Sequence, residues 1–290
     1  MTFIRYTDVG RFADVARPFL EEREVEFNLL LAVLESILAG EQSRPPFLAI
    51  VRDDAGAVNT IAMRTPPWNL LLGPSSREGL MLIAENLLAD AGVEVPGVHG
   101  RVQEAALFAE IWSARSGCAA TLDKTLRSFH LGTLRMPYHV NGEMRTAVSA
   151  DHDLVAEWSD RFAEDSGMND PAEARRARTR FMLDSGRFVL WEDAGQPVAM
   201  AGWHPSPPRG ARIGYVYTPP ELRGRGYATG ITAALSRQLL DSGCANCFLF
   251  TDLANPTSNS IYQKIGYEPV ADFHEYLFGE TGETGKVEGP

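Results

Sequence analysis

Apolar positions along this chain of 290 residues follow two spacings, which together predict a mixed α+β fold. Repeats of three and four residues predict amphipathic helices, whereas short β-branched or aromatic runs bounded by Gly, Pro or Asp predict strands. Helices are predicted at 9–20, 24–38, 77–89, 104–115, 154–162 and 231–240, with another beginning at Pro171, and strands at 47–51, 59–64, 69–72, 98–102, 144–148, 198–203, 213–218 and 248–251 with an extended stretch at 122–134.

The pattern repeats once along the chain. Two segments, 47–63 and 188–202, are each predicted to form a strand, a tight turn and a second strand, and these hairpins share an acidic turn, Asp53-Asp54-Ala55-Gly56 in the first half and Glu192-Asp193-Ala194-Gly195 in the second. Each hairpin follows helical segments and precedes a strand and a further helix, so a tandem duplication is the economical interpretation. We expect one α+β domain at 1–138, a second at 139–278 and a flexible Gly/Glu/Thr-rich tail at 279–290.

Composition narrows the possible partners. The net charge of −11 argues against a nucleic-acid partner, which usually requires a basic face, and mildly favours a cationic substrate. No apolar run is long enough to cross a membrane and the first residues lack a signal-peptide pattern, so we expect a cytoplasmic protein without a membrane partner. Cys244 and Cys247 form a CxxC without a second ligand pair; buried structural thiols and no metal site are expected.

A glycine-rich turn carries the first candidate chemistry. The run Arg223-Gly224-Arg225-Gly226-Tyr227-Ala228 follows a β-rich segment and a Pro-Pro break, and it opens a predicted helix. Glycines allow backbone N–H groups to approach a phosphate, and the helix dipole adds positive potential there. The turn lacks the Lys-Ser/Thr of a nucleoside-triphosphate loop and the third glycine of a dinucleotide-binding fingerprint, so another phosphorylated ligand is indicated.

A second motif identifies that ligand. The segment from Asn255 through Ser258 and Tyr262 to Gly266-Tyr267 follows the predicted strand 248–251. Together, the two motifs resemble the GNAT superfamily of acetyl-CoA-dependent N-acetyltransferases over roughly residues 144–277. The resemblance implies a tandem GNAT fold, with a mostly antiparallel mixed sheet flanked by helices in each half, and acetyl-CoA as the co-substrate.

The resemblance also assigns roles to residues. The turn would bind the pyrophosphate, the strand before it would pair with the acyl-pantetheine arm, and one backbone N–H of that strand would polarise the thioester carbonyl. Tyr262 would stabilise or protonate the leaving thiolate. Asn255 has two open roles, a cofactor contact or a turn cap, and Asn259 is expected to be a local helix-start residue. The implied cofactor-binding residues are Val216, Tyr217, Thr218, Arg223, Gly224, Arg225, Gly226, Tyr227, Ala228, Thr229, Asn255, Ser258 and Tyr262.

The general base is left open by the sequence. His204 is a candidate because its ordinary pKa suits the task, although a histidine beside Pro205 at a strand end is more often structural. Glu192 and Asp193 lie in a predicted turn and are expected to be solvated, and a relay through water would leave no sequence signal. The arginine-rich run 175–180 is interpreted as a solvated helix face, with a contact to substrate or to the other half as the alternative.

The first half lacks both motifs. Its hairpin is followed by residues 68–79, which contain no Arg-x-x-Gly-x-Gly/Ala pattern, so we expect a degenerate GNAT-like domain and one active site. The predicted function is direct acetyl transfer in a ternary complex to a primary amine of a small molecule or peptide, by a monomer or homodimer. The alternative is a non-catalytic acyl-CoA sensor or an interaction module on the same fold.

Overall fold

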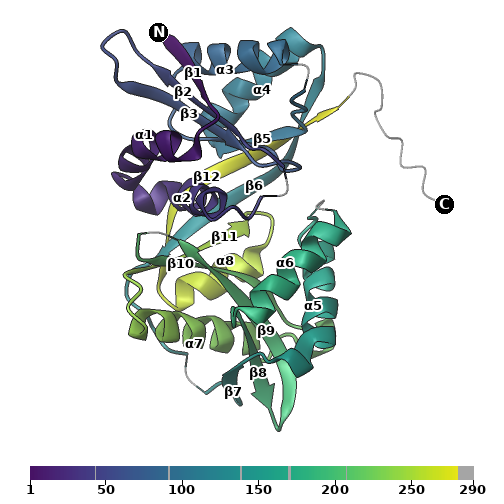
Figure 1. Cartoon of the computed structure of the whole chain (residues 1–290). Coiled ribbons are helices and arrows are strands. Elements are labelled where there is room, and N and C mark those ends of the chain that lie inside the picture. The colour runs from purple at the N-terminus through teal and green to yellow at the C-terminus, as the bar shows by residue number, and fades with distance from the viewer. Residues whose placement is uncertain (43, 91, 138, 169–170, 207, 280–290) are drawn as a thin grey trace, which may run out of the picture. The chain divides into compact units, whose positions relative to one another are not determined.

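The computed structural model describes residues 1–42, 44–90, 92–137, 139–168, 171–206 and 208–279, which form two compact units (Figure 1). The first unit contains Met1–Leu126 together with 271–279 of the described residues, and the second contains Arg127–Val270. Packing therefore groups 127–137 with the second unit and 271–279 with the first. The domain division at 138/139 stays a prediction, and of the predicted tail only Gly279 lies within the described residues.

In the first unit, helices cover both faces of a sheet with strand order β1-β2-β3-β4-β5-β12. Phe12 and Leu31 of the first helix pair pack on one face, and Leu80 and Phe108 of the second pair pack on the other. The elements are β1 (Thr2–Tyr6), α1 (Val9–Glu21), α2 (Glu24–Leu38), β2 (Phe47–Arg52), β3 (Val58–Arg64), β4 (Leu70–Leu72), α3 (Arg77–Ala89), β5 (Gly97–Arg101), α4 (Val102–Ser116) and the start of β6 (Ala119–Leu131).

The second unit repeats this plan with strand order β12-β6-β11-β10-β9-β8-β7. Val155 and Met182 belong to the core under α5 and α6, whereas Ile231 and Tyr262 belong to the core under α7 and α8. The elements are β7 (Glu143–Thr146), α5 (His152–Asp165), α6 (Ala172–Asp184), β8 (Phe188–Asp193), β9 (Gln196–Ser206), β10 (Gly210–Tyr217), α7 (Tyr227–Asp241), β11 (Asn246–Asp252), α8 (Pro256–Lys264) and β12 (Tyr267–Gly279), with short 3₁₀ turns at Ser149–Asp151 and Pro220–Leu222.

The predicted α+β fold class is confirmed, and α2 and α3 begin and end at the predicted residues. Two strands were not predicted. β1 is half-buried or exposed at every position and pairs with β2 alone, so its sequence lacks a clear apolar alternation. β12 is similarly half-buried along most of its length and contains Pro269. No helix in the described ranges is long and apolar enough to cross a membrane.

The predicted start of α6 is wrong by one residue. Pro171 is the N-cap and the helix begins at Ala172, without a side-chain cap at Pro171. Asp170, which would be the N-cap of a helix beginning at Pro171, lies outside the described residues. Pro171 has an extended ψ of 130°, which explains why it precedes the helix instead of occupying its first position.

Gly266 lies in the short connection between α8 and β12. Its replacement by alanine should strongly destabilise the protein. Its φ is +103°, and an added Cβ would lie 1.9 Å from the carbonyl oxygen of Thr133. Because the obstacle is backbone, we expect Gly266→Ala to lower the free energy of unfolding by about 3 kcal/mol or more, measured by urea denaturation.

Gly243→Ala provides the matched control for this prediction. Gly243 has a φ of +100° but nothing within 4 Å of an added Cβ, so only the backbone strain of about 1 kcal/mol should appear. Equal losses for the two variants would show that the approach of Gly266 to Thr133 contributes nothing.

Candidate functional site

Strands β10 and β11 pair over only part of their length. They run parallel from Gly210 opposite Asn246 to Ile213 opposite Leu249, and the paired register ends there. Both strands continue beyond this point, β10 to Tyr217 and β11 to Asp252. A strand edge that leaves its neighbour offers N–H and C=O groups to an extended ligand. The predicted residues Val216 and Tyr217 lie on this segment.

A β-bulge bends β10 at the same place. Gly214 is opposite Gly202 and Tyr217 is opposite Met200, so two residues of β10 face one of β9. One of the two is Tyr215, whose φ of +52° is rare and costly for a residue with a bulky side chain. The Tyr215 hydroxyl accepts a hydrogen bond from Arg178 Nε at 2.7 Å, and its ring packs edge-on against Phe188. Strain held by surrounding contacts next to a strand divergence is a feature of functional sites.

The glycine-rich turn follows β10 and leads into α7. Gly224 and Gly226 have φ values of +79° and +85°, and Gly226 is the N-cap, which leaves α7 without a side-chain cap. An added Cβ would meet nothing at Gly224 and only Val140 at 3.5 Å for Gly226. The first-turn N–H groups, from Tyr227 to Thr229, therefore have no side-chain cap, and the open space at the glycines would admit an anion.

The charged and aromatic side chains of this turn hold it in place. Arg223 donates to the carbonyl oxygen of Thr218 at 2.9 Å and to Asp165 of α5 at 2.6 Å. Tyr227 is buried, and its hydroxyl donates to Asp193 of the β8–β9 hairpin. The expectation that Asp193 is merely solvated is thus wrong. Because the Arg223 guanidinium binds Thr218 and Asp165, the donors left at this turn for a phosphate are the backbone N–H groups and the exposed guanidinium of Arg225.

The corresponding turn of the first unit is filled by its own side chains. Ser76 caps α3 by accepting a hydrogen bond from the Gly79 N–H at 3.0 Å, and its hydroxyl donates to Asn59. The hydroxyl of Thr60 lies 1.9 Å from the position of an added Gly79 Cβ, so it also occupies this helix start. A helix N-terminus covered in this way has no room for a phosphate, which supports the expectation of a single anion site.

Tyr262 lies on α8, with only 8% of its surface exposed. Its ring packs near Phe129 and Tyr267, with centroid separations of 6.3 and 6.2 Å. Burial raises the pKa of the Tyr262 hydroxyl to about 12, and a hydrogen bond with Ser258 opposes part of that increase. The phenol is therefore protonated at neutral pH and able to donate a hydrogen bond.

The two asparagines of this motif are structural in the observed geometry. Asn255 Oδ1 caps α8 by accepting a hydrogen bond from the Ser258 N–H at 3.0 Å, so the capping role is present. Asn259 Nδ2 donates to the carbonyl oxygens of Asp252 at 3.1 Å and Asn255 at 2.8 Å. These bonds tie the start of α8 to the end of β11 and thereby fix the position of Tyr262, one turn further on. A contact of Asn255 with the cofactor stays a prediction.

His204 is unsuited to act as the general base. Burial, followed by the charges of Arg212, Arg178 and Arg187, lowers the pKa of its imidazole to about 3. An efficient base has a pKa near the working pH, and this imidazole is far too weakly basic. The lowered pKa argues against His204 as the general base, and the identity of the base stays open.

Three arginines around His204 were missed as a group. Arg178 belongs to the run interpreted as a solvated face, yet it is half-buried against Tyr215, while Arg176 and Arg180 of the same run are exposed. Arg187 precedes β8, and Arg212 lies within β10. The one sequence signal is a charged residue inside an apolar strand, Arg212 between Ala211 and Ile213.

Neither cysteine of the CxxC is placed for reactive chemistry. Both are free thiols, and Cys247 is fully buried on β11. Burial, with a smaller contribution from Cys244, raises the pKa of the Cys247 thiol to about 12, so it is not a thiolate at neutral pH. Cys247 therefore fits the expected buried structural thiol, whereas Cys244 is only half-buried.

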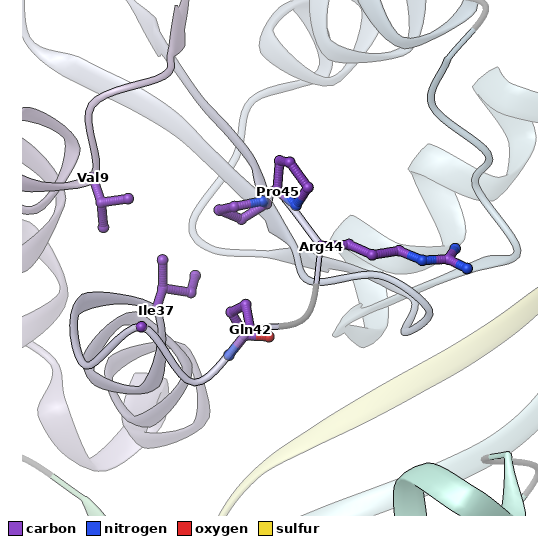
Figure 2. A pocket seen from close by; sticks show the side chains of 7 residues that line it. Val9, Ile37, Gln42, Arg44 and Pro45 are labelled. Atoms are coloured by element: carbon purple, nitrogen blue, oxygen red, sulfur yellow. The ribbon is translucent and has the colours of Figure 1, made fainter.

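An open hollow of about 340 Å³ lies in the first unit, and no residue of either motif is among its described lining residues. Figure 2 shows Val9 of α1 and Ile37 of α2 directed toward it, with the Arg44 guanidinium pointing away. Its remaining lining residues are Gly40, Gln42, Pro45 and Pro46. This set contains no nucleophile, acid or base, so the hollow is not a candidate active site.

Comparison with known proteins agrees with this geometry. Residues 152–267 match the sequence model of the Acetyltransferase (GNAT) family. A search of curated proteins returned no match.

Solved structures resemble the chain over almost its whole length. An acetyltransferase from the GNAT family of Colwellia psychrerythraea is 11% identical with a TM-score of 0.60, covering 96% of this chain and 100% of its own. A GCN5-related N-acetyltransferase from Sphaerobacter thermophilus is 13% identical with a TM-score of 0.62, and 94% of each chain is covered. A tandem GNAT protein from the clavulanic acid biosynthesis pathway is 12% identical with a TM-score of 0.60, covering 98% of this chain and 100% of its own. The chain thus has the GNAT fold over almost its whole length, and the Acetyltransferase (GNAT) family model matches its residues 152–267.

Proposed function

We propose that the second unit transfers an acetyl group from acetyl-CoA to a primary amine. The observation that carries the proposal is the combination, within one unit, of the divergence of β10 from β11 and the α7 N-terminus without a side-chain cap. The divergence suits an extended pantetheine arm, and the helix N-terminus suits a pyrophosphate. The match to the GNAT family over 152–267 supports acyl transfer as the reaction class.

Backbone groups would make most of the contacts with acetyl-CoA. N–H groups from Tyr227 to Thr229 would bind the pyrophosphate, and the edge of β10 at Val216 and Tyr217, together with the next residue, Thr218, would pair with the pantetheine arm. A backbone N–H at the β10 bulge would donate to the thioester carbonyl oxygen, where negative charge develops during attack. Acetyl-CoA supplies the activated acyl group, and the protein supplies position and charge stabilisation.

Transfer forms the bond between the amine nitrogen and the acyl carbon and breaks the bond between that carbon and sulfur. The amine must be neutral to attack, and the proton that it loses passes to solvent water. Tyr262 would donate a hydrogen bond to the departing thiolate, which then takes a proton from solvent.

The acidity of Tyr262 decides between hydrogen bonding and full proton transfer. Burial raises the pKa of its hydroxyl to about 12, so this phenol is a weak acid and complete transfer of its proton is disfavoured. Tyr262 therefore acts by stabilising the thiolate and does not hold a negative charge itself. Charge-assisted hydrogen bonds of this kind are among the stronger ones.

Thiol release with a panel of amines tests the proposal. We expect free CoA to form from acetyl-CoA only when an acceptor amine is present, with an acetylated amine detected by mass spectrometry. Binding of acetyl-CoA by isothermal titration, but no amine-dependent thiol release, would favour the non-catalytic sensor. Absence of binding at millimolar acetyl-CoA would favour the interaction module.

A further inference from the structure

A group of three arginines, Arg178, Arg187 and Arg212, surrounds His204 in the second unit; we call it the cationic cluster. All three charges lower the pKa of His204, and that of Arg178 also lowers the pKa of Arg212. All three guanidinium groups therefore lie within electrostatic reach of His204, and that of Arg178 also lies within reach of Arg212.

Arg212 is the member of the cluster that lacks a counterpart. Its Nη1 atom is buried and has no hydrogen-bond partner, and within the described part of the chain Arg212 makes no ion pair. Burial, as the largest cause, lowers the pKa of its guanidinium to about 10, so it still carries its charge at neutral pH. A buried donor or charge without a partner is costly in a folded protein.

Other arginines of the same unit have carboxylate partners for their guanidinium groups. Arg145 binds Asp151 through two nitrogens at 2.6 and 2.8 Å and Glu192 through a third at 2.7 Å. Arg223 is likewise paired with Asp165. Unlike Arg145 and Arg223, Arg212 has no carboxylate partner among the described residues, so its guanidinium is available to bind an anion from solution.

The cluster adjoins the place where β10 and β11 diverge. Arg212 is opposite His204 on β9 and Phe248 on β11, one residue before the last pair, Ile213 and Leu249. Arg178 donates to the hydroxyl of Tyr215, which is the strained residue of the bulge. The reacting carbonyl of the proposed function lies along this same bulge, so a ligand bound by the cluster would be a neighbour of the acyl group.

We propose that the acceptor amine also carries a carboxylate, and that Arg212 is the specificity-determining residue that binds this carboxylate. The proposal rests on acetyl transfer as the function of the second unit. A planar guanidinium matches a carboxylate with two parallel hydrogen bonds. The neutral imidazole of His204 can supply one further donor, and the positive charges of Arg178 and Arg187 add attraction. The amino group of the same acceptor remains free to attack the thioester.

The overall charge of the protein is compatible with such an acceptor. The chain carries a formal net charge of −11, which favours a cationic substrate at long range. An acceptor with one ammonium and one carboxylate has no net charge, so the field of the whole protein does not repel it. The local cluster then selects the carboxylate at short range, where desolvation strengthens the interaction.

The test compares each amino acid with its own primary amide as an acceptor. For the wild-type protein, we expect kcat/KM to be at least tenfold higher for the acids, and Arg212→Gln should lower this acid-to-amide ratio at least tenfold. Arg212→Lys, which keeps the charge but loses the paired geometry, should give an intermediate ratio. Arg237→Gln, which removes an exposed cation from α7, should leave the ratio unchanged.

Binding of the same acceptors to the CoA-loaded protein separates this proposal from the proposed function. Titration should show Arg212-dependent binding of amino acids even if no transfer occurs, which would support the carboxylate site and contradict the transferase. Transfer with equal efficiency to acids and amides by the wild type would overturn the carboxylate site and leave the transferase standing. A preference for O-phosphoethanolamine over β-alanine would assign the site to phosphate and overturn the carboxylate. If Arg212→Gln does not fold, the acid-to-amide ratios of the wild type and of Arg212→Lys still test the carboxylate site.

Discussion

Replacement of Gly226 by glutamate should weaken acetyl-CoA binding at least about a hundredfold, which corresponds to roughly 2.7 kcal/mol. Gly226 is the N-cap of α7 at a φ of +85°, and an added Cβ meets only Val140 at 3.5 Å. A glutamate there can place its carboxylate at the N–H groups that would otherwise bind the pyrophosphate. The substitution therefore fills the site with a competing anion and repels the ligand. Isothermal titration with acetyl-CoA measures the effect.

Two further variants separate charge from backbone strain in this experiment. Gly226→Ala keeps the strain of a side chain at positive φ but adds no charge, so affinity should fall much less. Gly56→Glu places the same residue at a nearly equal φ of +83° in a hairpin turn of the first unit, with nothing within 4 Å, and should leave affinity unchanged. An affinity of Gly226→Glu within threefold of the wild type would remove the α7 N-terminus from the binding site.

The parts of the site that lie on short contiguous segments could be predicted from the sequence. In the turn 223–228 and in the segment 255–267, glycines that allow a tight turn stand at fixed separations from functional side chains. Such fixed spacing can be recognised in a sequence. Gly224, Gly226 and Gly266 do adopt positive φ, as glycines at turns usually must. The fold class followed from the same local patterns, because buried strands and amphipathic helices each leave a periodic signal.

What could not be predicted depends on contacts between distant segments. The cationic cluster brings together α6, the residue before β8, and β10, and no local pattern reports that Arg178 is buried while Arg176 is not. The engagement of Arg223 with Asp165 joins residues 58 positions apart. The division of β6 and β12 between the two units is also a property of packing, and it could not be read from the position of the linker.

The contrast between the two units has a local physical cause. At α7 the N-cap residue is Gly226, which has no side chain to accept a hydrogen bond from the first turn. At α3 the N-cap residue is Ser76, whose hydroxyl accepts such a bond. A side-chain cap satisfies a first-turn N–H within the protein and stabilises the helix by about 1 kcal/mol. The first unit thus gains stability at the position where the second keeps donors available for a ligand. A duplicated fold can in this way retain its core while one copy loses a binding function.

Replacement of Tyr262 by phenylalanine should lower kcat by about a hundredfold while acetyl-CoA affinity stays within about twofold. The hydroxyl would donate to sulfur as the thiolate leaves, and loss of one such donor in a buried site typically costs two to three orders of magnitude. The ring contacts with Phe129 and Tyr267 survive the substitution, so the position of α8 should not change. Steady-state thiol release and isothermal titration measure the two quantities.

The pH dependence of turnover gives a second readout of the same residue. Tyr262 acts in its protonated form, and because burial raises its pKa to about 12, this form persists throughout the stable range of the protein. An alkaline loss of kcat below about pH 10 would therefore have to come from another group, and it should be present in Tyr262→Phe as well. Disappearance of such a loss in the variant would show that Tyr262 titrates far lower than its buried environment implies.

Tyr267→Phe is the matched control for this prediction. Tyr267 is also buried, its ring lies beside that of Tyr262, and its hydroxyl shares a 2.8 Å hydrogen bond with Ser236 of α7. Loss of that bond should reduce the free energy of unfolding by about 1 kcal/mol and leave kcat near the wild-type value. A comparable fall in kcat for both variants would mean that packing around the ring pair, and not the hydroxyl of Tyr262, controls turnover. Unchanged turnover in Tyr262→Phe would remove its hydroxyl from the mechanism, and solvent would then have to stabilise the thiolate.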